Sequence, residues 1–422
     1  MAPHTATCSA PVNIAVVKYW GKRDVPLILP TNDSLSVTLD QDHLRSLTSA
    51  AADQAWPAGD RLWLNGVEES IGESGRLRTC IDELRRERRA LEEKDSSLPK
   101  LSTFPLRICS ENNFPTAAGL ASSASGFAAL VSSVSTLFEL SSSVSVSELS
   151  RIARQGSGSA CRSLFGGFVA WQGGEAADGS DSLAVEVAPR EHWPELQALI
   201  CVVSDAKKGT PSTAGMQRSV ATSPLLAARI ANVVPQRMDT MRKAIAARDF
   251  ESFADATMQD SNNFHACCLD TSPPIFYMND VSRAIVALVE ELNRASRAAG
   301  SGAVAAYTYD AGPNAVLYAP KQNVPLILQL VRHYFPNADF DDTFNLLGAG
   351  ANASHRGAQE AQPLPEALPQ GFNAAVIPVH EAGAVRRLIH TQVGDGPRVL
   401  PASECLLNEQ GEPIRLQRTK RA

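Results

Sequence analysis

The sequence predicts an α+β protein made of two halves, rather than a chain in which strands and helices alternate regularly. Short apolar runs bounded by turn residues occur in both halves, segments with helical spacing separate them irregularly, and no segment repeats at a fixed period. We expect an N-terminal lobe over residues 1–190 and a C-terminal lobe over residues 191–422. The turn-rich, acidic segment Gly173–Asp181 is the expected hinge between them.

In the first half, strands are expected where apolar and β-branched residues cluster, over residues 7–17, 34–39, 61–65, 105–110 and 167–172. Helices are expected where apolar residues recur every three or four positions, over residues 75–93, 120–138 and 145–155. The third helix opens at Ser145 with Glu148 three residues later, which is typical of a capping box.

In the second half, the same patterns predict strands over residues 198–204, 304–309 and 315–319. Helices are expected over residues 212–220, 223–248, 250–259, 279–298 and 324–334. Residues 348–370 consist mainly of Gly, Ala, Pro and Gln, so we expect a loop insertion there and assign no function to it.

The composition excludes several classes of protein. The 39 Lys and Arg residues against 45 Asp and Glu residues give a net charge of −6, which argues against a nucleic-acid-binding protein. No stretch approaches the roughly 20 apolar residues of a membrane span, and the N-terminus lacks the pattern of a secretory signal. The eight cysteines form no CxxC pair, which favours reduced thiols over disulfides or a zinc site. We therefore expect a cytoplasmic protein without membrane or nucleic-acid partners.

The segment from Glu111 to Gly126 combines a strand end, a loop of Pro, Thr, Ala and Gly, and a helix start made of small residues. Small side chains let backbone N–H groups approach a ligand, and the N-terminus of a helix attracts anions. Ser122 and Ser123 add hydroxyl groups that suit phosphate oxygens or Mg²⁺. The GxxxxGK[ST] pattern of a Walker loop is absent. A tightly packed helix start without a ligand explains the same residues equally well.

Two further segments of the first half carry cations. The segment Arg154–Gly167 contains two Gly-Ser pairs, and its Arg162 could bind a carboxylate or phosphate with two parallel hydrogen bonds. A glycine-rich turn with a solvated arginine is the alternative. The segment Asn13–Arg23 places Lys18 and Lys22 after an apolar strand, where a buried ammonium group needs an anion. Lysines at the protein surface would give the same pattern.

The second half offers one carboxylate of interest. Asp310 stands at the end of an expected strand, before a Gly-Pro turn, where aspartate most often forms the turn itself. The glycine-rich segments Gly300–Ala305 and Gly348–Ala353 fit a loose dinucleotide fingerprint but do not follow a strand and open a helix, so we discount them. His265 is interpreted as a hydrogen-bonding helix residue rather than a base.

Together these segments resemble one family. The loop Pro115–Ser125 resembles the phosphate-binding motif of the galactokinase, homoserine kinase, mevalonate kinase and phosphomevalonate kinase superfamily. The segments Lys18–Lys22, Ser157–Arg162 and Tyr309–Asn314 are similar to motifs of the mevalonate diphosphate decarboxylase family within it. The resemblance covers most of the chain from Thr7 to Leu347, and its pattern is similar to eukaryotic, fungal members.

The resemblance implies an enzyme that converts (R)-5-diphosphomevalonate and ATP into isopentenyl diphosphate, CO₂, ADP and phosphate, with Mg²⁺, in the mevalonate pathway of isoprenoid and sterol biosynthesis. It implies a two-lobed small-molecule-kinase-like fold with a left-handed βαβ unit in the N-terminal lobe, an α+β C-terminal lobe, a deep cleft between the lobes, and a homodimer. Two alternatives stay open: a small-molecule kinase of the same superfamily that releases no CO₂, and a ligand-sensing relative without turnover.

The resemblance also implies roles for particular residues. Asp310 falls on the position that deprotonates the tertiary alcohol, Arg162 on the position that contacts the substrate carboxylate and orients Asp310, and Lys18 on a lysine beside them. Ser123, the fourth expected catalytic residue, falls on a position that contacts the γ-phosphate or Mg²⁺. The expected contacts of diphosphomevalonate are Asn13, Tyr19, Trp20, Gly21, Lys22, Arg76, Ser157, Gly158, Ser159, Ala160, Cys161, Arg162 and Thr213. The expected contacts of the ATP phosphates are Gly119, Leu120, Ala121, Ser122 and Ser123.

Two positions limit what the resemblance implies. Ser125 stands where many members have alanine, a small change that the helix should tolerate. Arg76 is preferred to Arg78 as the diphosphate contact because of its spacing to Cys80.

Overall fold

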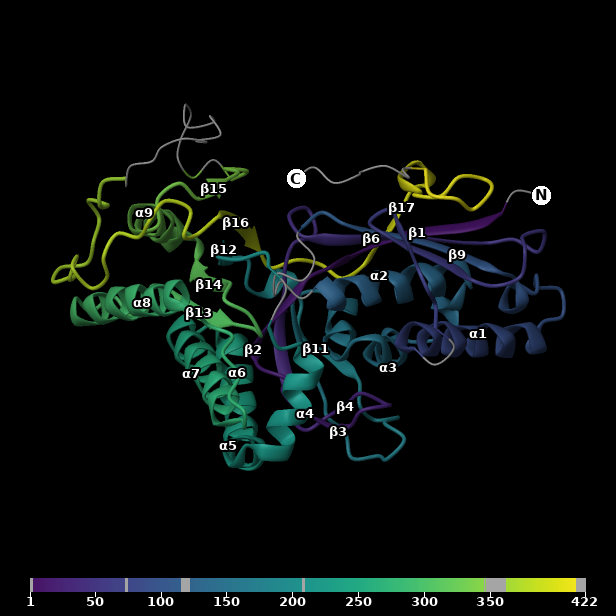
Figure 1. Ribbon diagram of the computed structural model, residues 1–422, viewed down its shortest axis with the longest axis horizontal. Helices are drawn as coiled ribbons and strands as arrows, with labels where there is room; N and C mark the ends of the chain where they lie inside the picture. The colour runs from purple at the N-terminus through teal and green to yellow at the C-terminus, as the bar shows by residue number, and fades with distance from the viewer. Residues whose placement is uncertain are drawn as a thin grey trace.

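The computed structural model describes residues 3–72, 75–114, 122–206, 209–344, 346 and 362–414. Figure 1 shows the N-terminal part of the chain, coloured purple to blue, beside a group of green C-terminal helices. Each half contains both sheets and helices, which confirms the α+β prediction. In the part of the chain that the structure describes, no helix is long and apolar enough to cross a membrane.

A six-stranded sheet in the order β17-β1-β6-β9-β7-β8 dominates the N-terminal half. Its strands are β1 (His4–Pro11), β6 (Arg45–Ala52), β7 (Arg61–Leu64), β8 (Val67–Glu69), β9 (Leu106–Asn112) and β17 (Arg398–Leu400). Its helices are α1 (Arg76–Lys94), α2 (Ser122–Leu137) and α3 (Val146–Gly156). The strands β7 and β9 are parallel and are connected through α1, so they form a βαβ unit. Its left-handed sense stays a prediction.

Helix α2 packs directly on β1 and β6, and this close packing explains the composition of β6. The strand reads Arg-Ser-Leu-Thr-Ser-Ala-Ala-Ala, while α2 brings the buried Ala128 and Ala129 to the contact region. The Ser133 hydroxyl of α2 donates a hydrogen bond of 2.7 Å to the carbonyl of Thr48 in β6. Small residues on both elements let the helix approach the sheet closely. Thr48 is therefore the one β-branched residue of this strand, and the sequence did not predict it.

A four-stranded sheet in the order β11-β10-β5-β2 also belongs to the N-terminal half. Its strands are β2 (Asn13–Val17), β5 (Ser34–Thr38), β10 (Phe168–Trp171) and β11 (Ala184–Ala188), and a separate hairpin is formed by β3 (Lys22–Asp24) and β4 (Leu29–Pro30). The segment Gly173–Asp181 connects β10 to β11, which pair with each other. The prediction that this segment is a hinge is therefore wrong, because it is a loop between two neighbouring strands of one sheet.

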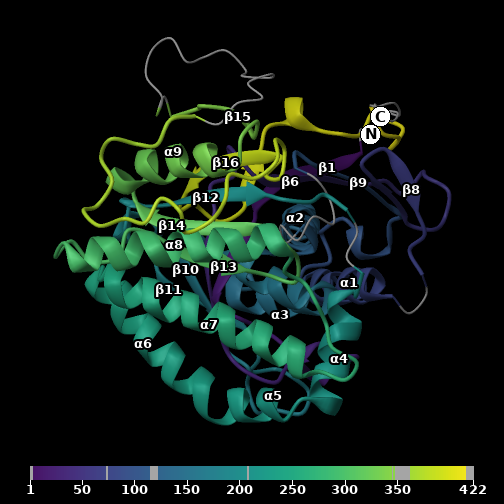
Figure 2. The same ribbon diagram turned by 60° about the vertical axis from the view of Figure 1, so that its left-hand side comes forward.

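The C-terminal half contains a five-stranded sheet in the order β13-β14-β12-β16-β15. Its strands are β12 (Leu196–Val202), β13 (Ala306–Tyr309), β14 (Ala315–Pro320), β15 (Asp339–Phe340) and β16 (Arg387–Gln392). Its helices are α4 (Ser212–Thr222), α5 (Pro224–Ala228), α6 (Val234–Ala247), α7 (Phe250–Asp270), α8 (Asp280–Ala298) and α9 (Val324–Tyr334). Figure 2 shows α7 and α8 running across the front of the molecule with the strands behind them.

Short helical turns connect these elements. Turns of 3₁₀ helix occur at Leu101–Thr103, Leu140–Ser142, Gly158–Leu164, Arg190–His192, Lys321–Asn323 and Ala402–Glu404, and a π-helical turn, η5 (Arg229–Val233), joins α5 to α6. The turn Gly158–Leu164 is named η3.

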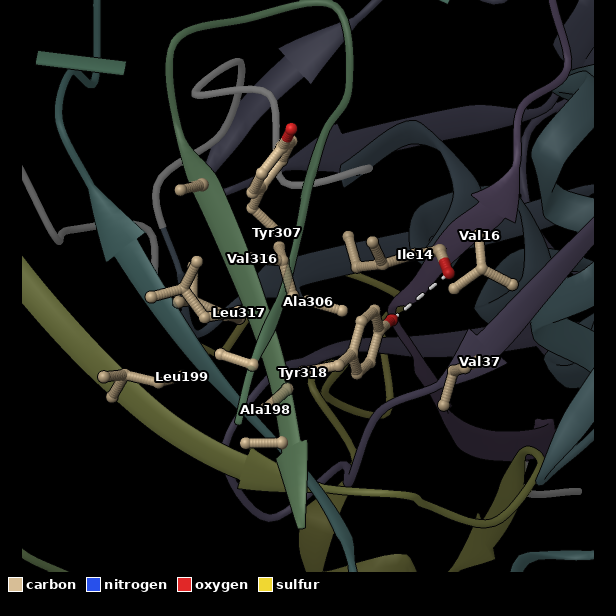
Figure 3. Packing of buried hydrophobic residues seen from close by; sticks show 14 of the residues in the cluster. Ile14, Val16, Val37, Ala198, Leu199, Ala306, Tyr307, Val316, Leu317 and Tyr318 are labelled. Carbon is tan, nitrogen blue, oxygen red and sulfur yellow. Dashed lines mark hydrogen bonds between the residues drawn. The ribbon is translucent and has the colours of Figure 1, made fainter. Parts of the chain in front are cut away.

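The largest apolar core lies between the four-stranded and five-stranded sheets. It combines Ile14 and Val37 of the N-terminal half with Leu199, Leu317 and Tyr318 of the C-terminal half. In Figure 3 the Tyr318 ring points toward β2, where its hydroxyl donates a hydrogen bond of 3.3 Å to the carbonyl of Ile14. The two halves therefore share one core. Strand β2 pairs with β5 of the N-terminal half and also accepts a hydrogen bond from Tyr318 of the C-terminal half.

Several predicted elements differ from the observed ones. The predicted strand over residues 7–17 is interrupted at Val12 and becomes β1 and β2, which belong to different sheets. The predicted helix over residues 250–259 continues to Asp270 as α7. The capping box of Ser145 and Glu148 is present with both of its hydrogen bonds, as predicted.

The last described strands return from the C-terminal half to the N-terminal half. Strand β16 ends in the five-stranded sheet, Val393 then forms a bridge with Leu39, and β17 pairs with β1 at the edge of the six-stranded sheet. We call residues 387–400 the C-terminal strap. Gly394 lies at the closest approach, because a Cβ atom there would lie 2.5 Å from the carbonyl oxygen of Leu39. The strap thus joins two sheets through one crowded position.

Replacing Gly394 by alanine is expected to lower the free energy of unfolding by about 1–3 kcal/mol, because the added methyl group must push backbone atoms apart. Equilibrium urea denaturation measures this loss. Gly72→Ala is the control, since a Cβ atom there meets no atom within 4 Å, and its effect should stay within about 0.5 kcal/mol. An unchanged stability of Gly394→Ala would show that the strap moves aside without cost.

Candidate active site

A cavity of about 880 Å³ lies between the two halves and takes its walls from both. The sequence-predicted residues that line it are Asn13, Lys18, Tyr19, Trp20, Lys22, Arg76, Ser123, Ser157, Gly158, Ser159, Arg162, Thr213 and Asp310. They come from segments almost 300 residues apart in the chain. The structure therefore brings the expected catalytic residues to one place.

Lys18 and Asp310 form the central ion pair of this cavity. Lys18 directly follows β2, and Asp310 directly follows β13. Their Nζ and Oδ1 atoms lie 2.6 Å apart, with the Lys18 side chain 3% exposed and the Asp310 side chain 28% exposed. A buried ammonium group requires such a partner. The carboxylate, being more exposed, remains accessible from the cavity.

Arg162 is buried in η3 and is held by hydrogen bonds from three sides. Its Nε donates to Asn13 Oδ1 at 3.2 Å and to Ser36 Oγ at 3.0 Å, and its Nη1 donates to Ser34 Oγ at 2.5 Å. Burial lowers the pKa of its guanidinium group, with nearby Cys161 and Asp310 acting in the opposite direction. Among the described residues Arg162 makes no hydrogen bond to Asp310, whose carboxylate pairs with Lys18 instead. The second terminal nitrogen of Arg162 is left for a ligand in the cavity.

A second group of cations lies at another wall. Arg76 Nη2 donates to Thr213 Oγ1 at 3.1 Å, and Lys22 Nζ donates to the same oxygen at 3.4 Å. Burial lowers the pKa of Lys22 to about 8, and the charge of Arg76 contributes to this shift. Arg78, the alternative to Arg76, pairs instead with Asp82. The first turns of α1 and α4 both reach this wall, which suits an anion.

Tyr19 and Trp20, the aromatic pair that follows Lys18, make different contacts. The Tyr19 ring lies edge-on to Trp171 with 4.6 Å between centroids, and its buried hydroxyl has no hydrogen-bond partner in the described part of the chain. Burial raises the pKa of Tyr19, so the hydroxyl stays a donor at the cavity wall. Trp20 packs edge-on against Phe264 and donates from Nε1 to Ser219 Oγ at 2.9 Å.

Gly21 and two residues of η3 were expected to contact the ligand but do not line the cavity. Gly21 has a φ of +103° and forms the turn beside Thr31, where a Cβ atom would meet Thr31 Oγ1 at 2.6 Å. Ala160 and Cys161 are fully buried behind the cavity wall. The direct contact expected of these three residues stays a prediction, although none of them lines the cavity.

Gly158, the first residue of η3, has no room for a side chain. A Cβ atom there would lie 2.8 Å from Cε1 of Tyr19 and 2.9 Å from the Trp171 ring. The neighbouring carbonyl of Ser159 accepts a hydrogen bond of 3.0 Å from Asn13 Nδ2. The Gly-Ser segment is thus fitted between two aromatic rings and the strand that carries Lys18.

A second cavity of about 1000 Å³ lies beside the first. Its lining surface is mostly apolar and is formed by Leu62, Leu64, Asn65, Glu69, Ser70, Leu77, Ser110, Asn112, Ser122, Ser123, Gly126, Phe127 and Leu130. Ser123 lines both cavities, and its hydroxyl lies 3.1 Å from that of Ser157. Gly119, Leu120 and Ala121 lie outside the described residues. A ligand with a planar apolar group in the second cavity could therefore extend a polar chain toward Ser123 and the first cavity.

Sequence reasoning missed several residues of the site. Ala15, Ser212, Met216, Phe264 and Ala311 line the first cavity. Ser212, Met216 and Phe264 belong to α4 and α7, where no local pattern distinguishes them. Ala15 and Ala311 stand inside the segments Asn13–Arg23 and Tyr309–Asn314, but an alanine side chain carries no group that predicts a contact.

His265 lies in α7 and makes a hydrogen bond to the backbone of Tyr309, as expected of a hydrogen-bonding helix residue. It is buried next to Phe264, and its Nε2 has no partner in the described chain. Burial lowers its pKa to about 4, and the charge of Lys18 adds to this effect. His265 is therefore a neutral neighbour of the ion pair.

Two family models match the chain. The N-terminal domain described as diphosphomevalonate decarboxylase-like matches residues 10–184, and the mevalonate 5-diphosphate decarboxylase C-terminal domain matches residues 198–400. The chain is also similar to the diphosphomevalonate decarboxylase of Ganoderma lucidum, with 62% identity over 414 residues that cover 98% of this chain and 100% of the relative.

Solved structures agree with these relatives. The chain is similar to a crystal structure of mevalonate 5-diphosphate decarboxylase, with a TM-score of 0.81 and 48% identity, covering 96% of this chain and 98% of that one. It is also similar to a structure described as MDDEF in complex with MVAPP, AMPPCP and magnesium, with a TM-score of 0.70 and 28% identity, covering 95% of this chain and 100% of that one.

Proposed function

The chain belongs to the mevalonate diphosphate decarboxylase family, and on that premise we propose which residues of its cavity carry out the reaction. The enzyme decarboxylates 5-diphosphomevalonate at the expense of ATP and releases isopentenyl diphosphate, CO₂, ADP and phosphate. One observation carries the proposal: the Lys18–Asp310 pair, with a 2.6 Å contact, lies in a cavity that Arg162 also lines.

The reaction requires both a base and cations. A 3-hydroxy acid does not lose CO₂ and hydroxide together, because hydroxide is a poor leaving group. Transfer of a phosphoryl group from ATP to the tertiary alcohol creates a good leaving group, and loss of CO₂ then supplies the electron pair of the new double bond. We assign to Asp310 the removal of the alcohol proton, in concert with phosphoryl transfer because a carboxylate is a weak base for an alcohol.

Lys18 and Arg162 have separate roles in this proposal. Lys18 holds one carboxylate oxygen of Asp310, which leaves the other to accept the proton. Arg162 binds the carboxylate of the substrate, because its planar guanidinium is held in place by Asn13 and Ser34 and still has a nitrogen available. The proposed place of the diphosphate is near Lys22 and Arg76, which share a contact with Thr213. These cations offset the charge of two anionic substrates despite a net charge of −6.

The second cavity takes ATP in this proposal, with its phosphates directed to Ser123. The solved complex with MVAPP, AMPPCP and magnesium supports ATP as a co-substrate, since AMPPCP is an analogue of ATP. No group of three or more His, Cys, Asp or Glu side chains in the described ranges could hold a metal alone. This fits Mg²⁺, which is commonly bound by substrate phosphates, water and one or two protein oxygens. The Ser123 hydroxyl is the proposed protein ligand, and the ion would neutralise charge on the transferred phosphoryl group.

The test of the function follows two products in one reaction. Purified protein is mixed with Mg-ATP and 5-diphosphomevalonate, and CO₂ and ADP are measured together. Equal release of both is the expected result. ADP without CO₂ would assign the chain to the small-molecule kinases of the superfamily, and binding of ATP with no product would identify a ligand-sensing relative.

The KM for 5-diphosphomevalonate is expected to rise as the pH increases above about 8. The pKa of Lys22 is lowered to about 8, so above this pH the free enzyme loses a positive charge that faces the diphosphate. Steady-state kinetics between neutral and alkaline pH measure the change. Lys22→Gln should have a high KM already at neutral pH and a flat profile. If its KM rises with pH as in the wild type, another group is responsible.

Three further proposals come with the family. We propose that the enzyme is a homodimer, that it works in the cytoplasm, and that its lobes divide near residue 190. Sedimentation of the purified protein and microscopy of a tagged chain test the first two, and limited proteolysis near residue 190 tests the third.

A further inference from the structure

An ion pair without an assigned role lies directly behind Lys18. It joins Arg229, the first residue of the π-helical turn η5, to Asp260 in the middle of α7, and both side chains are 0% exposed. Arg229 Nη1 donates to Asp260 Oδ1 at 2.9 Å, and Nη2 donates to Oδ2 at 3.0 Å. The pair is thus bidentate, which fixes the relative orientation of both groups.

This ion pair also binds both backbone groups of Lys18. The Lys18 N–H donates to Asp260 Oδ2 at 2.7 Å, and Arg229 Nη2 donates to the Lys18 carbonyl at 3.1 Å. Asn32 Nδ2 donates to the same carbonyl at 3.0 Å. Lys18 lies just beyond the end of β2, where no neighbouring strand in the sheet holds it. The Arg229–Asp260 pair of the C-terminal half therefore holds the Lys18 backbone together with Asn32.

The same part of α7 also controls the position of Asp310. Ser261, which follows Asp260, accepts a hydrogen bond of 3.0 Å from the backbone N–H of Tyr309 through its Oγ. Tyr309 is the last residue of β13 and precedes Asp310. Two consecutive residues of one helix thus fix the backbones from which both members of the catalytic ion pair extend.

Stability alone does not explain why this position holds an ion pair. Removing two charges from water is costly, and replacing a buried ion pair by apolar side chains of similar size is often neutral or stabilising. Here Arg229 Nε is in addition buried without a hydrogen-bond partner in the described chain. An apolar pair, however, could not bond to the N–H and the carbonyl of Lys18.

We propose that Arg229 and Asp260 are positioning residues, which hold the backbone of Lys18 so that its ammonium group meets Asp310. This inference rests on the roles proposed above for Lys18 and Asp310. Because displacement of a catalytic group by about 1 Å can reduce a rate by about 10²-fold, the pair should affect turnover much more than substrate binding.

The test replaces both charges at once, in the variant Arg229→Met/Asp260→Leu, so that no unpaired charge is left buried. We expect kcat to fall by about 10- to 100-fold, while the KM values of both substrates change by less than about threefold. Arg229→Lys keeps a charge but cannot make two parallel bonds, so its kcat should lie between those of the wild type and the double variant. This milder variant also serves if the double variant does not fold. A wild-type kcat in both would overturn the proposal.

A matched control exists in the N-terminal half. Arg88 and Glu92 form a buried ion pair of 3.0 Å between Nε and Oε1, with side chains 0% and 3% exposed, and neither residue lines the cavity. Arg88→Met/Glu92→Leu should lower thermal stability but leave kcat unchanged at a temperature where the protein is folded. An equal loss of kcat in this control would assign the effect of Arg229 and Asp260 to general destabilisation.

A double-mutant cycle with Lys18→Ala separates positioning from an independent role. If the pair acts through Lys18, adding Arg229→Met/Asp260→Leu to Lys18→Ala should cost less than about threefold in kcat. Losses that multiply would overturn the inference and leave the proposed function intact. A wild-type kcat in Lys18→Ala itself would instead overturn the role of Lys18, and the inference with it.

Discussion

Replacing Asp310 by asparagine is expected to reduce kcat by about 10²- to 10⁴-fold, while 5-diphosphomevalonate still binds. The amide has nearly the same shape but cannot take the proton of the tertiary alcohol. It also leaves the Lys18 ammonium, 3% exposed, without its anionic partner at 2.6 Å. Turnover is measured by ADP release, and substrate binding by titration calorimetry without ATP.

The matched control for this variant is Asp239→Asn. Asp239 also pairs with a lysine, Lys243, at 2.7 Å, but on the exposed surface of α6. Loss of that pair should leave kcat unchanged, because exposed ion pairs contribute little. Near-normal turnover in Asp310→Asn would remove Asp310 from the role of the base and would direct attention to its neighbours in the cavity.

Replacing Arg162 by glutamine should reduce kcat/KM by about 10²- to 10³-fold, as expected when a preorganised electrostatic donor is lost. The glutamine amide can replace part of the contact to Asn13 or Ser34, but it has no charge for the substrate carboxylate. The loss should appear in both kcat and KM, since the carboxylate is bound before it leaves as CO₂. Steady-state kinetics with both substrates varied measure it.

Arg154→Gln is the control that separates the loss of a buried arginine from the loss of a contact to the substrate. Arg154 is 1% exposed in α3, and its Nη1 donates to the carbonyls of Gly179 and Ser182, outside the cavity. This variant should lose stability but retain its kinetic constants at a temperature where it is folded. Unchanged kinetics in Arg162→Gln would contradict the proposed contact between Arg162 and the substrate carboxylate.

The main residues predicted for the site stand in short contiguous motifs, and the structure brings these residues together at one cavity. Lys18, Arg162 and Asp310 each had an ordinary explanation alone, and only the combination of motifs favoured a common site. Membership of a motif does not by itself place a residue at the cavity: Gly21 and Cys161 lie inside these motifs but do not line it. A motif records which residues occur together, whereas the side to which each residue points depends on local backbone geometry.

The parts that the sequence did not reveal depend on distant contacts. Strand β6 is rich in Ala and Ser because α2 packs closely against it, and that contact is not visible in the local pattern. Arg229 and Asp260 are separated by 31 residues and meet Lys18 more than 200 residues away. Their side chains are ordinary helix residues until tertiary packing buries them. Such pairs follow from the fold and not from any spacing.

The C-terminal strap has a consequence for synthesis of the protein. Strand β17 is the outer neighbour of β1, so this edge of β1 forms its strand pairing only after residues 398–400 have been synthesised. On the ribosome, the nascent chain therefore carries an unpaired β1 edge throughout most of its translation. Because an unpaired strand edge is a template for aggregation, we expect this edge to be open to incorrect pairing until residues 398–400 have been synthesised.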